Sequence, residues 1–317
     1  MELSRIEEVF FPETHLAKNK ALSSGMKFVY YTTAEVAYQV ITDQRIWMRN
    51  TSTMNDYMEI DYGQKLVLNA YEAVSGANLK AAINYCHIGL AEEVWTLFVS
   101  WLPSFRADTY ISCISEHDPS EDDLGRLSMW RAYGGSTGVA LVLNAAVPFF
   151  QMGPNALGAF SSPVSYLNQI QFLELIDRVA ENIRVNAVEI RNADRQLVKN
   201  ILFTMYRVAV LCTKHPGFKE EREWRIFASP SMFPQHLLES GIAIIRGVPQ
   251  PILKLPLVNR PEKGIMGLAI SDLLAKVIIG PCQFPDVTRR AIFQGLENAN
   301  VPDPGSRIVK SDIPLRN

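Results

Sequence analysis

The chain has 317 residues, which is enough for one large domain or two ordinary ones. Hydrophobic residues make up 48% and charged residues 20%, a balance that is typical of a soluble globular protein and excludes a disordered one. The formal net charge of -2 supplies no general attraction to nucleic acid or to a membrane surface. Binding to nucleic acid or to a membrane surface would therefore need a local patch of positive charge.

The four cysteines and five histidines are scattered along the chain, without a C-x-x-C pair. Cys86 and His87 are adjacent, but neighbouring side chains diverge on a strand or a helix, which is poor spacing for metal ligands. We therefore expect no metal site. Scattered cysteines, no secretion-signal layout at the N-terminus and apolar windows too short to span a bilayer predict a cytoplasmic protein without a membrane segment.

The first half of the chain is predicted to mix short strands with helices. Residues 1–24 form an N-terminal arm, with a short helix that stops near Pro12. β-branched and aromatic residues indicate strands, and apolar residues at helical spacing indicate helices. The predicted strands cover residues 27–31, 45–48, 109–114 and 138–143, and the two longest predicted helices cover residues 61–83 and 88–101.

The second half begins with a long predicted helical pair over residues 165–191 and 194–212. A strand over residues 221–228 follows directly. Its face with Arg222, Trp224, Ile226 and Ala228 is apolar enough to bury from Trp224 onward. The remaining predicted elements are strands near residues 242–246, 275–280 and 307–310 and a helix over residues 286–298.

The predicted elements favour an α+β fold over a doubly wound parallel sheet, because the helices cluster instead of alternating strictly with strands. We expect a mixed or antiparallel sheet core with a helical insertion. The prediction is one domain over residues 1–317, with the helical segments 61–101 and 165–212 packed on the sheet core. The nucleotide-binding fingerprints G-x-G-x-x-G and G-x-x-x-x-G-K are absent from the sequence.

Two polar segments lie in the first part of the chain, and each allows a functional and a structural interpretation. Tyr30, Tyr31 and Thr32 end a strand and enter a helix, where N–H groups and hydroxyls can receive a phosphate or a ribose, or simply cap the helix. Asn55 and Asp56 form either the polar lining of a cleft or the N-cap of the next helix.

A third segment, from Ser128 to Tyr133, carries two aromatic residues at helical spacing. Trp130 and Tyr133 occupy positions i and i+3, so they lie on neighbouring parts of one helix surface. They form either an aromatic wall for a planar ring or ordinary core packing.

The fourth segment is the strand that carries Glu221, Glu223 and Arg225. Strand alternation places these three side chains on one face, with the two carboxylates roughly 6–7 Å apart along the strand. Such a row is either a solvated edge or a site for acid–base chemistry and anion binding.

Taken in order, these segments resemble the DUF2971 family, a widespread group of bacterial proteins of unknown function. The shared pattern is an aromatic strand end followed by Thr, an Asn-Asp loop, a Met-Trp-x-x-Tyr segment and an E-x-E-x-R strand. The matching residues here are Tyr30-Tyr31-Thr32, Asn55-Asp56 with Glu59, Met129-Trp130 with Tyr133, and Glu221 to Arg225; the tail matches through residues 277–281 and 311–316.

The same layout is similar to the ADP-ribosyltransferase fold, in which three strands carry an NAD site. This resemblance implies that Glu223 is the catalytic acid and that Glu221 orients or deprotonates the nucleophile. It further implies that the cofactor-binding residues are Tyr30, Tyr31, Thr32, Asn55, Asp56, Ser128, Trp130, Tyr133 and Arg225, with NAD as the substrate and no metal. Many relatives have His or Arg where this chain has Tyr30.

The resemblance implies NAD-dependent ADP-ribosyl transfer or NAD hydrolysis by a cytoplasmic bacterial protein, with an association to phage defence. The acceptor, a protein or a nucleic acid, is left open. A non-enzymatic module that binds a nucleotide or a protein is the main alternative, which Tyr30 in place of a basic residue favours. Processing of nucleic-acid ends is a second alternative, which the acidic pI of 6.2 disfavours.

Overall fold

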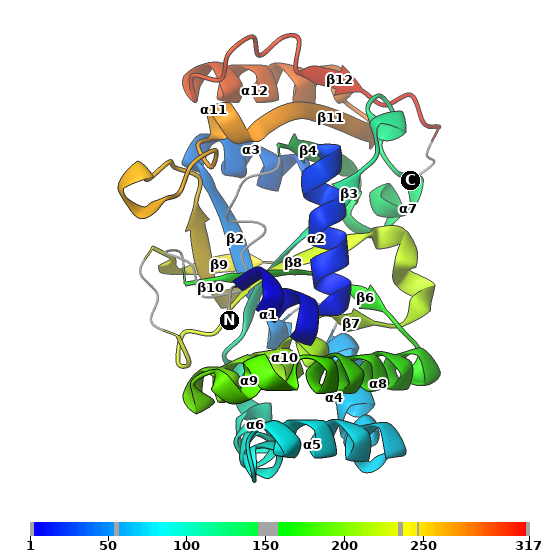
Figure 1. Cartoon of the computed structure of the whole chain (residues 1–317). Coiled ribbons are helices and arrows are strands. Elements are labelled where there is room, and N and C mark those ends of the chain that lie inside the picture. Colours follow the sequence, from blue (N-terminus) through cyan, green and yellow to red (C-terminus); the bar gives the residue numbers. More distant parts are fainter. Residues whose placement is uncertain (1–2, 54–56, 145–157, 234–236, 246, 315–317) are drawn as a thin grey trace. The chain divides into compact units, whose positions relative to one another are not determined.

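The computed structural model describes residues 3–53, 57–144, 158–233, 237–245 and 247–314 (Figure 1). The chain divides into two compact units, each built from three separate stretches of sequence. Unit 1 comprises residues 1–20, 50–109 and 162–219, and unit 2 comprises residues 21–49, 110–161 and 220–317. The expectation that the whole chain behaves as a single domain stays a prediction.

Unit 1 is mainly helical, as the two clustered helical segments predict. Its elements are α1 (Leu3–Phe10), the start of α2 (Pro12–Ser24), α4 (Tyr57–Glu72), α5 (Val74–Cys86), α6 (Leu90–Ala107), α8 (Gln169–Val185), α9 (Ala187–Asn192), α10 (Arg195–Leu211) and the short parallel strands β6 (Ser165–Tyr166) and β7 (Thr213–Lys214). Helix α8 begins at a capping box in which Asn168 and Gln171 bond each other's backbone N–H groups.

Three predicted helical segments in unit 1 differ from the structure. One of them, 165–191, begins with the strand β6 and continues as α8 and α9, which meet at Asn186. The predicted helix 61–83 is two helices that meet at Ala73, which precedes α5 in an extended conformation. The arm at residues 1–24 holds a second helix, because Pro12 does not stop the chain but starts α2 at its first position, where its fixed φ and missing N–H are tolerated.

Unit 2 is built around a mixed sheet, which confirms the predicted α+β class. Its strands are β1 (Lys27–Thr33), β2 (Arg45–Asn50), β3 (Tyr110–His117), β4 (Thr137–Leu143), β5 (Phe160–Pro163), β8 (Glu223–Ala228), β9 (Glu239–Ile245), β10 (Val248–Pro256), β11 (Leu274–Cys282) and β12 (Ile308–Lys310). The order is β12-β11-β4-β1-β3-β2-β10-β9, with β8 between β3 and β5. Strand β12 runs parallel to β11, whereas β1 and β4 are antiparallel to both of their neighbours and β8 is antiparallel to β3.

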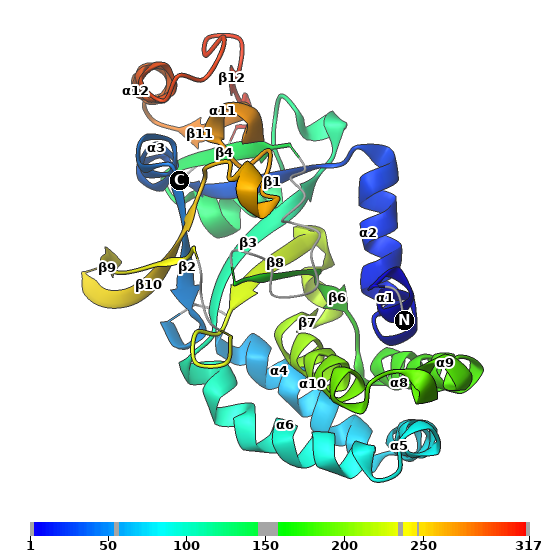
Figure 2. The same ribbon diagram turned by 60° about the vertical axis from the view of Figure 1, so that its left-hand side comes forward.

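The helices of unit 2 cover the central strands. Helix α3 (Ala34–Asp43) packs against β4 and against α12 (Pro285–Asn298), which also contacts β11 (Figures 1 and 2). The short helix α11 (Ile270–Leu273) precedes β11. The short helix α7 (Leu127–Met129) continues into a π-helical turn over Trp130–Gly134.

One face of the central sheet forms an apolar core with this π-helical segment. The cluster consists of Val29, Tyr31, Met129, Trp130, Ala140, Val142 and Ile278, all buried. Its strand members alternate with residues of the opposite face, as the pleat requires. The segment 127–134 is therefore held on the same sheet face as Tyr31.

Strand β1 pairs with β4 over a longer stretch than with β3. It pairs with β4 from Phe28 to Thr33, but its register with β3 covers only Lys27 to Val29. Beyond Val29, β1 follows β4 and leaves β3. The side chains on the face of Tyr31 therefore border a region where the sheet opens.

The predicted strand 221–228 is too long at its start. Residues Pro216–Glu221 form a 3₁₀ helix, and Arg222 adopts a left-handed conformation with φ of 45°. Strand β8 begins only at Glu223, so the prediction that Glu221 belongs to the same strand row is wrong. The left-handed residue interrupts the extended backbone, because a strand requires negative φ throughout.

Candidate functional site

A small hollow, with a cavity volume of about 30 Å³, lies in unit 2 on the face of the sheet where β1 leaves β3. Its walls come from β1, β3, the α7 segment and the start of β8. The lining residues are Val29, Tyr31, Cys113, Ile114, Ser115, Met129, Tyr133, Glu221 and Glu223. Four of the predicted site residues, Tyr31, Tyr133, Glu221 and Glu223, thus meet at one place.

The two carboxylates reach the hollow with different partners. Glu223 is only 5% exposed and accepts a hydrogen bond from Nε of the buried Arg225 at 2.7 Å. Glu221 Oε1 accepts the Tyr133 hydroxyl at 3.2 Å. One acid is therefore ion-paired inside the protein, and the other is hydrogen-bonded to an aromatic wall residue. Paired acids in such different surroundings are suited to different roles in one reaction.

Glu221 faces the hollow because the backbone before β8 is held in place by its carbonyl groups. The Glu220 carbonyl accepts Nη1 of Arg126 at 2.8 Å, and the Glu221 carbonyl accepts the Ser115 hydroxyl and Nη1 of Arg126. The Arg222 carbonyl accepts the Glu116 N–H at 2.8 Å. These bonds satisfy three consecutive carbonyls at the left-handed residue and fix the direction of the chain.

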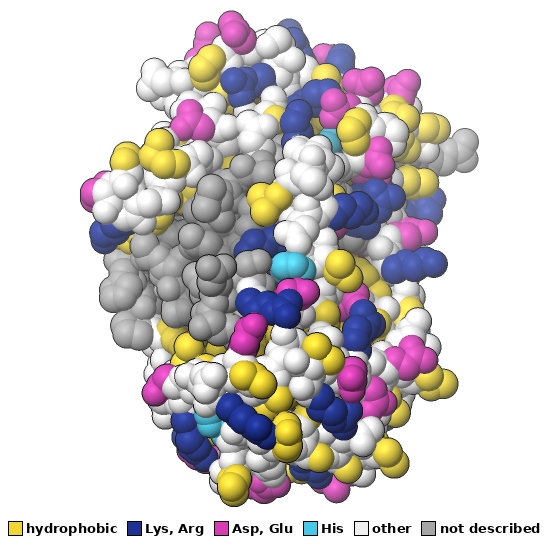
Figure 3. All heavy atoms as spheres, viewed as in Figure 1, with side chains coloured by type: hydrophobic (Ala, Val, Ile, Leu, Met, Phe, Trp, Pro, Cys, Tyr) yellow, Lys and Arg dark blue, Asp and Glu magenta, His cyan; other side chains and the backbone are white. Residues whose placement is uncertain are grey.

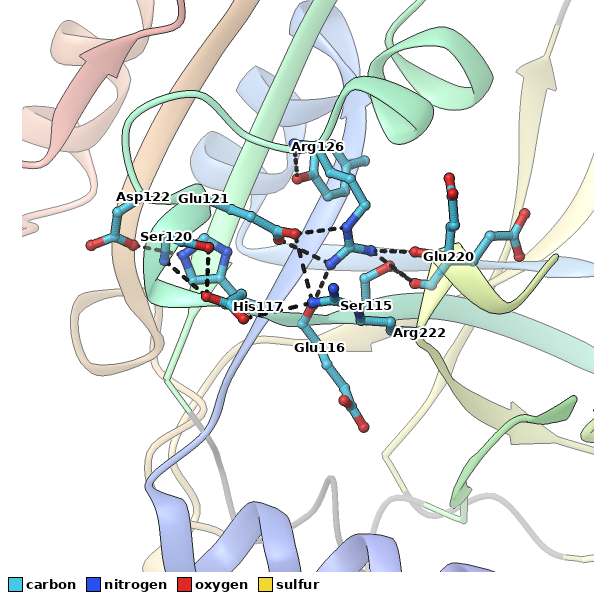
Figure 4. Close-up of polar contacts among 12 residues, drawn as sticks. Ser115, Glu116, His117, Ser120, Glu121, Asp122, Arg126, Glu220 and Arg222 are labelled. Atoms are coloured by element: carbon cyan, nitrogen blue, oxygen red, sulfur yellow. Dashed lines mark hydrogen bonds and ion pairs between the residues drawn. The ribbon is translucent and has the colours of Figure 1, made fainter.

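Arg126 is the centre of this network (Figure 4). Its Nε and Nη2 each lie 2.9 Å from a Glu121 carboxylate oxygen, which is a bidentate ion pair, and Nη2 also donates to the Glu116 carbonyl at 2.9 Å. Both side chains are largely buried, at 11% and 14% exposed. A planar guanidinium with five donors suits such a fixed set of acceptors.

The loop that carries Glu121 is anchored a second time beside this ion pair. Nε2 of the buried His117 lies 2.6 Å from Oδ1 of Asp122 (Figure 4). Nζ of Lys276 lies 2.8 Å from Oδ2 of the same carboxylate. Partial burial acts to raise the pKa of Asp122, but the hydrogen bonds from His117 and Lys276 outweigh it and lower that pKa below its ordinary value. The loop is thus tied to β3 and β11.

Tyr31 forms the wall opposite the acids and is bonded to the same network. Its hydroxyl accepts the backbone N–H of Arg126 at 2.8 Å. Burial raises the pKa of Tyr31 to about 12, so the hydroxyl is neutral at physiological pH. Its ring meets the edge of Trp130 with centroids 4.9 Å apart.

Trp130 supports the hollow and does not line it. It is 1% exposed, and its Nε1–H donates to the Leu124 carbonyl at 2.9 Å. Gly138 and Gly280 leave room for its ring, since a Cβ at Gly280 would lie 2.8 Å from the indole. Trp130 was expected either to form an aromatic wall or to pack in the core, and the structure shows core packing. The aromatic residues that line the hollow are Tyr31 and Tyr133.

The other predicted binding residues lie elsewhere. Tyr30 and Thr32 project from the opposite face of β1, where burial raises the pKa of Tyr30 to about 12 despite its hydrogen bond with Thr32. Ser128 does not line the hollow, and its buried hydroxyl has no hydrogen-bond partner among the described residues. Asn55 and Asp56 lie outside the described residues.

Sequence reasoning missed several residues of the hollow and its supports. Cys113 and Ser115 lie opposite Arg225 and Glu223 in the β3–β8 register. Alternation within β3 puts both on one face, but which face becomes clear only from pairing partners more than a hundred residues away. Arg126 and Glu121 have no sequence pattern that singles them out, because their bonds are mainly to distant backbone carbonyls and to each other.

Within the described parts of the chain, no three His, Cys, Asp or Glu side chains are arranged to hold a metal ion. Likewise, none of the described helices is long and apolar enough to cross a membrane. Charges of both signs mingle on the face of unit 1 that carries α1, α8 and α9 (Figure 3), and pairs such as Arg178 with Glu13 join them. This surface gives no support to the nucleic-acid alternative.

The fold and the hollow define a mixed α+β protein with two carboxylates in a partly aromatic site. The model of the DUF2971 family, described as a protein of unknown function, matches residues 129–226. This match confirms the resemblance to that family and spans Met129, Tyr133, Glu221 and Glu223. No curated protein matches the chain, and no solved structure matches it.

Proposed function

We propose that unit 2 binds NAD and breaks its nicotinamide–ribose bond, passing ADP-ribose to water or to an acceptor. The observation that carries the proposal is the meeting of Glu221 and Glu223 with Tyr31 and Tyr133 around one hollow. A fixed carboxylate in a low-dielectric site is what stabilises positive charge on a sugar during glycosyl transfer.

The residues fit a two-acid mechanism. As the bond between the ribose C1′ and the nicotinamide nitrogen breaks, its electron pair leaves with neutral nicotinamide and the ribose becomes an oxocarbenium ion. The ionised Glu223 stabilises that charge, and Arg225 keeps Glu223 ionised and oriented. Glu221 takes the proton from the attacking water or acceptor as the new bond to C1′ forms. Tyr133 orients Glu221.

The size of the hollow limits what it holds. Its cavity volume of about 30 Å³ is far below that of ligand pockets, which typically span about 300–1,000 Å³. We therefore assign it only the reacting carbon of the nicotinamide ribose, at the mouth between Tyr31 and Tyr133, with the rest of NAD outside. Because Arg225 is buried against Glu223, its role in this proposal is to hold Glu223 and not to bind the diphosphate.

The mixed sheet and the acid-bearing strand support an ADP-ribosyltransferase-like arrangement as part of this proposal. A cytoplasmic location, expected from the scattered cysteines, and a role in phage defence, implied by the family resemblance, belong to the same proposal. The acceptor is a protein or a nucleic acid.

The test is nicotinamide release from NAD by the full chain, with Glu223→Gln and Glu221→Gln as variants. We expect kcat to fall by about 100-fold or more for Glu223→Gln, and less for Glu221→Gln with water as acceptor. Glu239→Gln is the matched control, because Glu239 is an exposed acid paired with Arg45 and lies away from the hollow. Equal rates for wild type and Glu223→Gln would refute the mechanism.

A nucleotide- or protein-binding module without catalysis is the second candidate. The observation that favours it is the burial of Glu223 against Arg225 beside a small hollow, since a ligand-binding role needs no exposed acid. Calorimetry with NAD and ADP-ribose separates the two functions. Binding that Tyr133→Ala abolishes, with no nicotinamide release by the wild type, would establish the module.

A further inference from the structure

Three features of Arg126 set it apart from a surface ion pair. Its side chain is 11% exposed. Each of its five N–H donors faces an acceptor: two face Glu121, two face the carbonyls of Glu220 and Glu221, and one faces the carbonyl of Glu116. In addition, its backbone N–H donates to the Tyr31 hydroxyl.

These bonds reach two opposite walls of the hollow. The guanidinium contacts the backbone immediately before β8, which carries Glu221 and Glu223. The backbone N–H contacts Tyr31 on β1, and the α7 segment with Met129 starts at the next residue, Leu127. One residue is thus bonded to elements that are distant in sequence but share the hollow.

We infer that Arg126 is the positioning residue of the site, and that it sets the placement of Glu221 relative to Tyr31 across the hollow. The effect of Arg126 on catalysis rests on the proposed function, whereas its effect on the backbone around Glu221 does not. Without the guanidinium, the Glu220 carbonyl loses its donor, the Glu221 carbonyl keeps only Ser115, and the left-handed conformation at Arg222 loses part of its support.

Lysine is the informative replacement, because it keeps the positive charge next to Glu121 but has three donors on a single nitrogen. A point charge cannot face Glu121 bidentately and also reach the carbonyls of Glu116, Glu220 and Glu221. Arg126→Lys therefore separates charge from geometry.

The experiment measures two quantities on the full chain carrying Arg126→Lys. Hydrogen–deuterium exchange in residues 216–223 should rise by about 10-fold or more as the segment loosens. The kcat for nicotinamide release should fall by about 100-fold, with KM changed by less than about 3-fold, because a displacement of about 1 Å of a reacting group costs this much in rate. A purely structural role would lower the amount of folded protein, without a fall in the kcat of the folded protein at nearly constant KM.

The matched control is Arg45→Lys, since Arg45 forms a bidentate but exposed ion pair with Glu239 in the same unit. It should change neither quantity. Glu121→Gln provides a second variant that keeps the guanidinium and weakens only its anchor, and it should produce a smaller change of both quantities in the same direction.

Unchanged exchange in residues 216–223 of Arg126→Lys would overturn the inference, and so would a KM effect without a kcat effect. If the wild type releases no nicotinamide, the proposed function fails, but the exchange measurement still decides whether Arg126 positions the Glu221 backbone. The two failures are therefore distinguishable.

Discussion

At the scale of single residues, the most consequential arrangement is the buried pair of Glu223 and Arg225. Transfer of a charge from water into the protein costs free energy, and the attraction of its partner offsets that cost only while both charges are present. The pair therefore holds the Glu223 carboxylate against Arg225 in the sheet core while it still borders the hollow. This combination of burial and access suits a group that must respond to charge forming in a substrate.

Removal of the Glu223 carboxylate should destabilise unit 2 strongly. We expect Glu223→Ala to lower the free energy of unfolding by about 3–5 kcal/mol, because it leaves the buried Arg225 charge without this partner. Urea unfolding gives the value. Glu239→Ala, which breaks an exposed pair, should cost less than about 1 kcal/mol. Similar losses for both variants would contradict the structural role of the buried pair.

Tyr31 should make stability depend on pH in the alkaline range. Its pKa is about 12 when folded and about 10 when unfolded, so the unfolded chain loses this proton first as pH rises. The stabilising contribution is complete below pH 10 and is lost between pH 10 and 12, up to about 2–3 kcal/mol. Tyr31→Phe should therefore show a shallower fall of unfolding free energy with pH in this window than the wild type. Identical slopes would show that Tyr31 does not ionise differently on folding.

Half of the site was predictable from residues alone, and the other half was not. The E-x-E spacing and the aromatic residues Tyr31 and Tyr133 indicate chemistry through their own types and intervals, and they do meet in the hollow. Trp130 has the same appearance in the sequence but is buried, because the space left by Gly138 and Gly280 depends on strand register. Arg126 was not identified, because many of its partners are backbone carbonyls, which every residue carries and which therefore leave no pattern in the sequence.

At the scale of elements, a single backbone conformation determines where β8 begins. The residue types of 221–228, with one face apolar from Trp224 onward, predict a continuous strand, but Arg222 is left-handed and Glu221 ends a 3₁₀ helix. The interruption is stabilised by β3 and Arg126, which bond the carbonyls of residues 220–222. Tertiary contacts thus override the local pattern. Most other strands are predicted well, because their β-branched runs and their burial agree.

Substitutions at Arg222 should separate backbone strain from side-chain contacts. Valine is strongly disfavoured at a φ of 45°, whereas glycine adopts it freely. We expect Arg222→Val to be less stable than Arg222→Gly by about 1–2 kcal/mol in thermal or urea unfolding. Both variants lose the weak contacts of the guanidinium with Asp118 and Glu121, so these cancel in the comparison. Equal stability would mean that residue 222 is not left-handed in solution.

The packing of Trp130 against the sheet should be sensitive to a single added methyl group. A Cβ at Gly280 would lie 2.8 Å from two ring carbons of Trp130, so Gly280→Ala forces the ring to shift. We expect a loss of about 1–3 kcal/mol in unfolding free energy and a change in near-ultraviolet circular dichroism. Gly305→Ala is the control, because its Cβ would meet only Phe293 at an ordinary 3.6 Å. A neutral Gly280→Ala would mean that the indole packs elsewhere.

At the scale of the whole molecule, the chain alternates between two units in six stretches. Sequence composition gives no sign of this, because the boundaries at residues 20, 49, 109, 161 and 219 carry no linker-like composition. Both units draw on distant parts of the chain, so their contacts are largely non-local. This is why the α+β class and most elements were predictable while the division into units was not.

Neither unit can be excised as a continuous piece. A fragment of residues 110–317 lacks β1, which lies between β3 and β4 in the sheet. We expect this fragment alone to show no cooperative thermal transition by circular dichroism, because two strands lose their common neighbour. Addition of residues 1–109 should restore the transition. A native-like spectrum of the isolated fragment would show that β1 is dispensable for the fold.

Because β1 pairs with strands that are synthesised later, the hollow forms late during synthesis of the chain. Tyr31 is synthesised early and Glu223 late, and at roughly 5–20 residues per second the ribosome adds the second about 10–40 seconds after the first. Until residue 223 has left the exit tunnel, the hollow lacks the wall that the start of β8 supplies. A ribosome-bound chain is therefore inert at this site until the start of β8 has emerged, and the activity we propose begins only after that point.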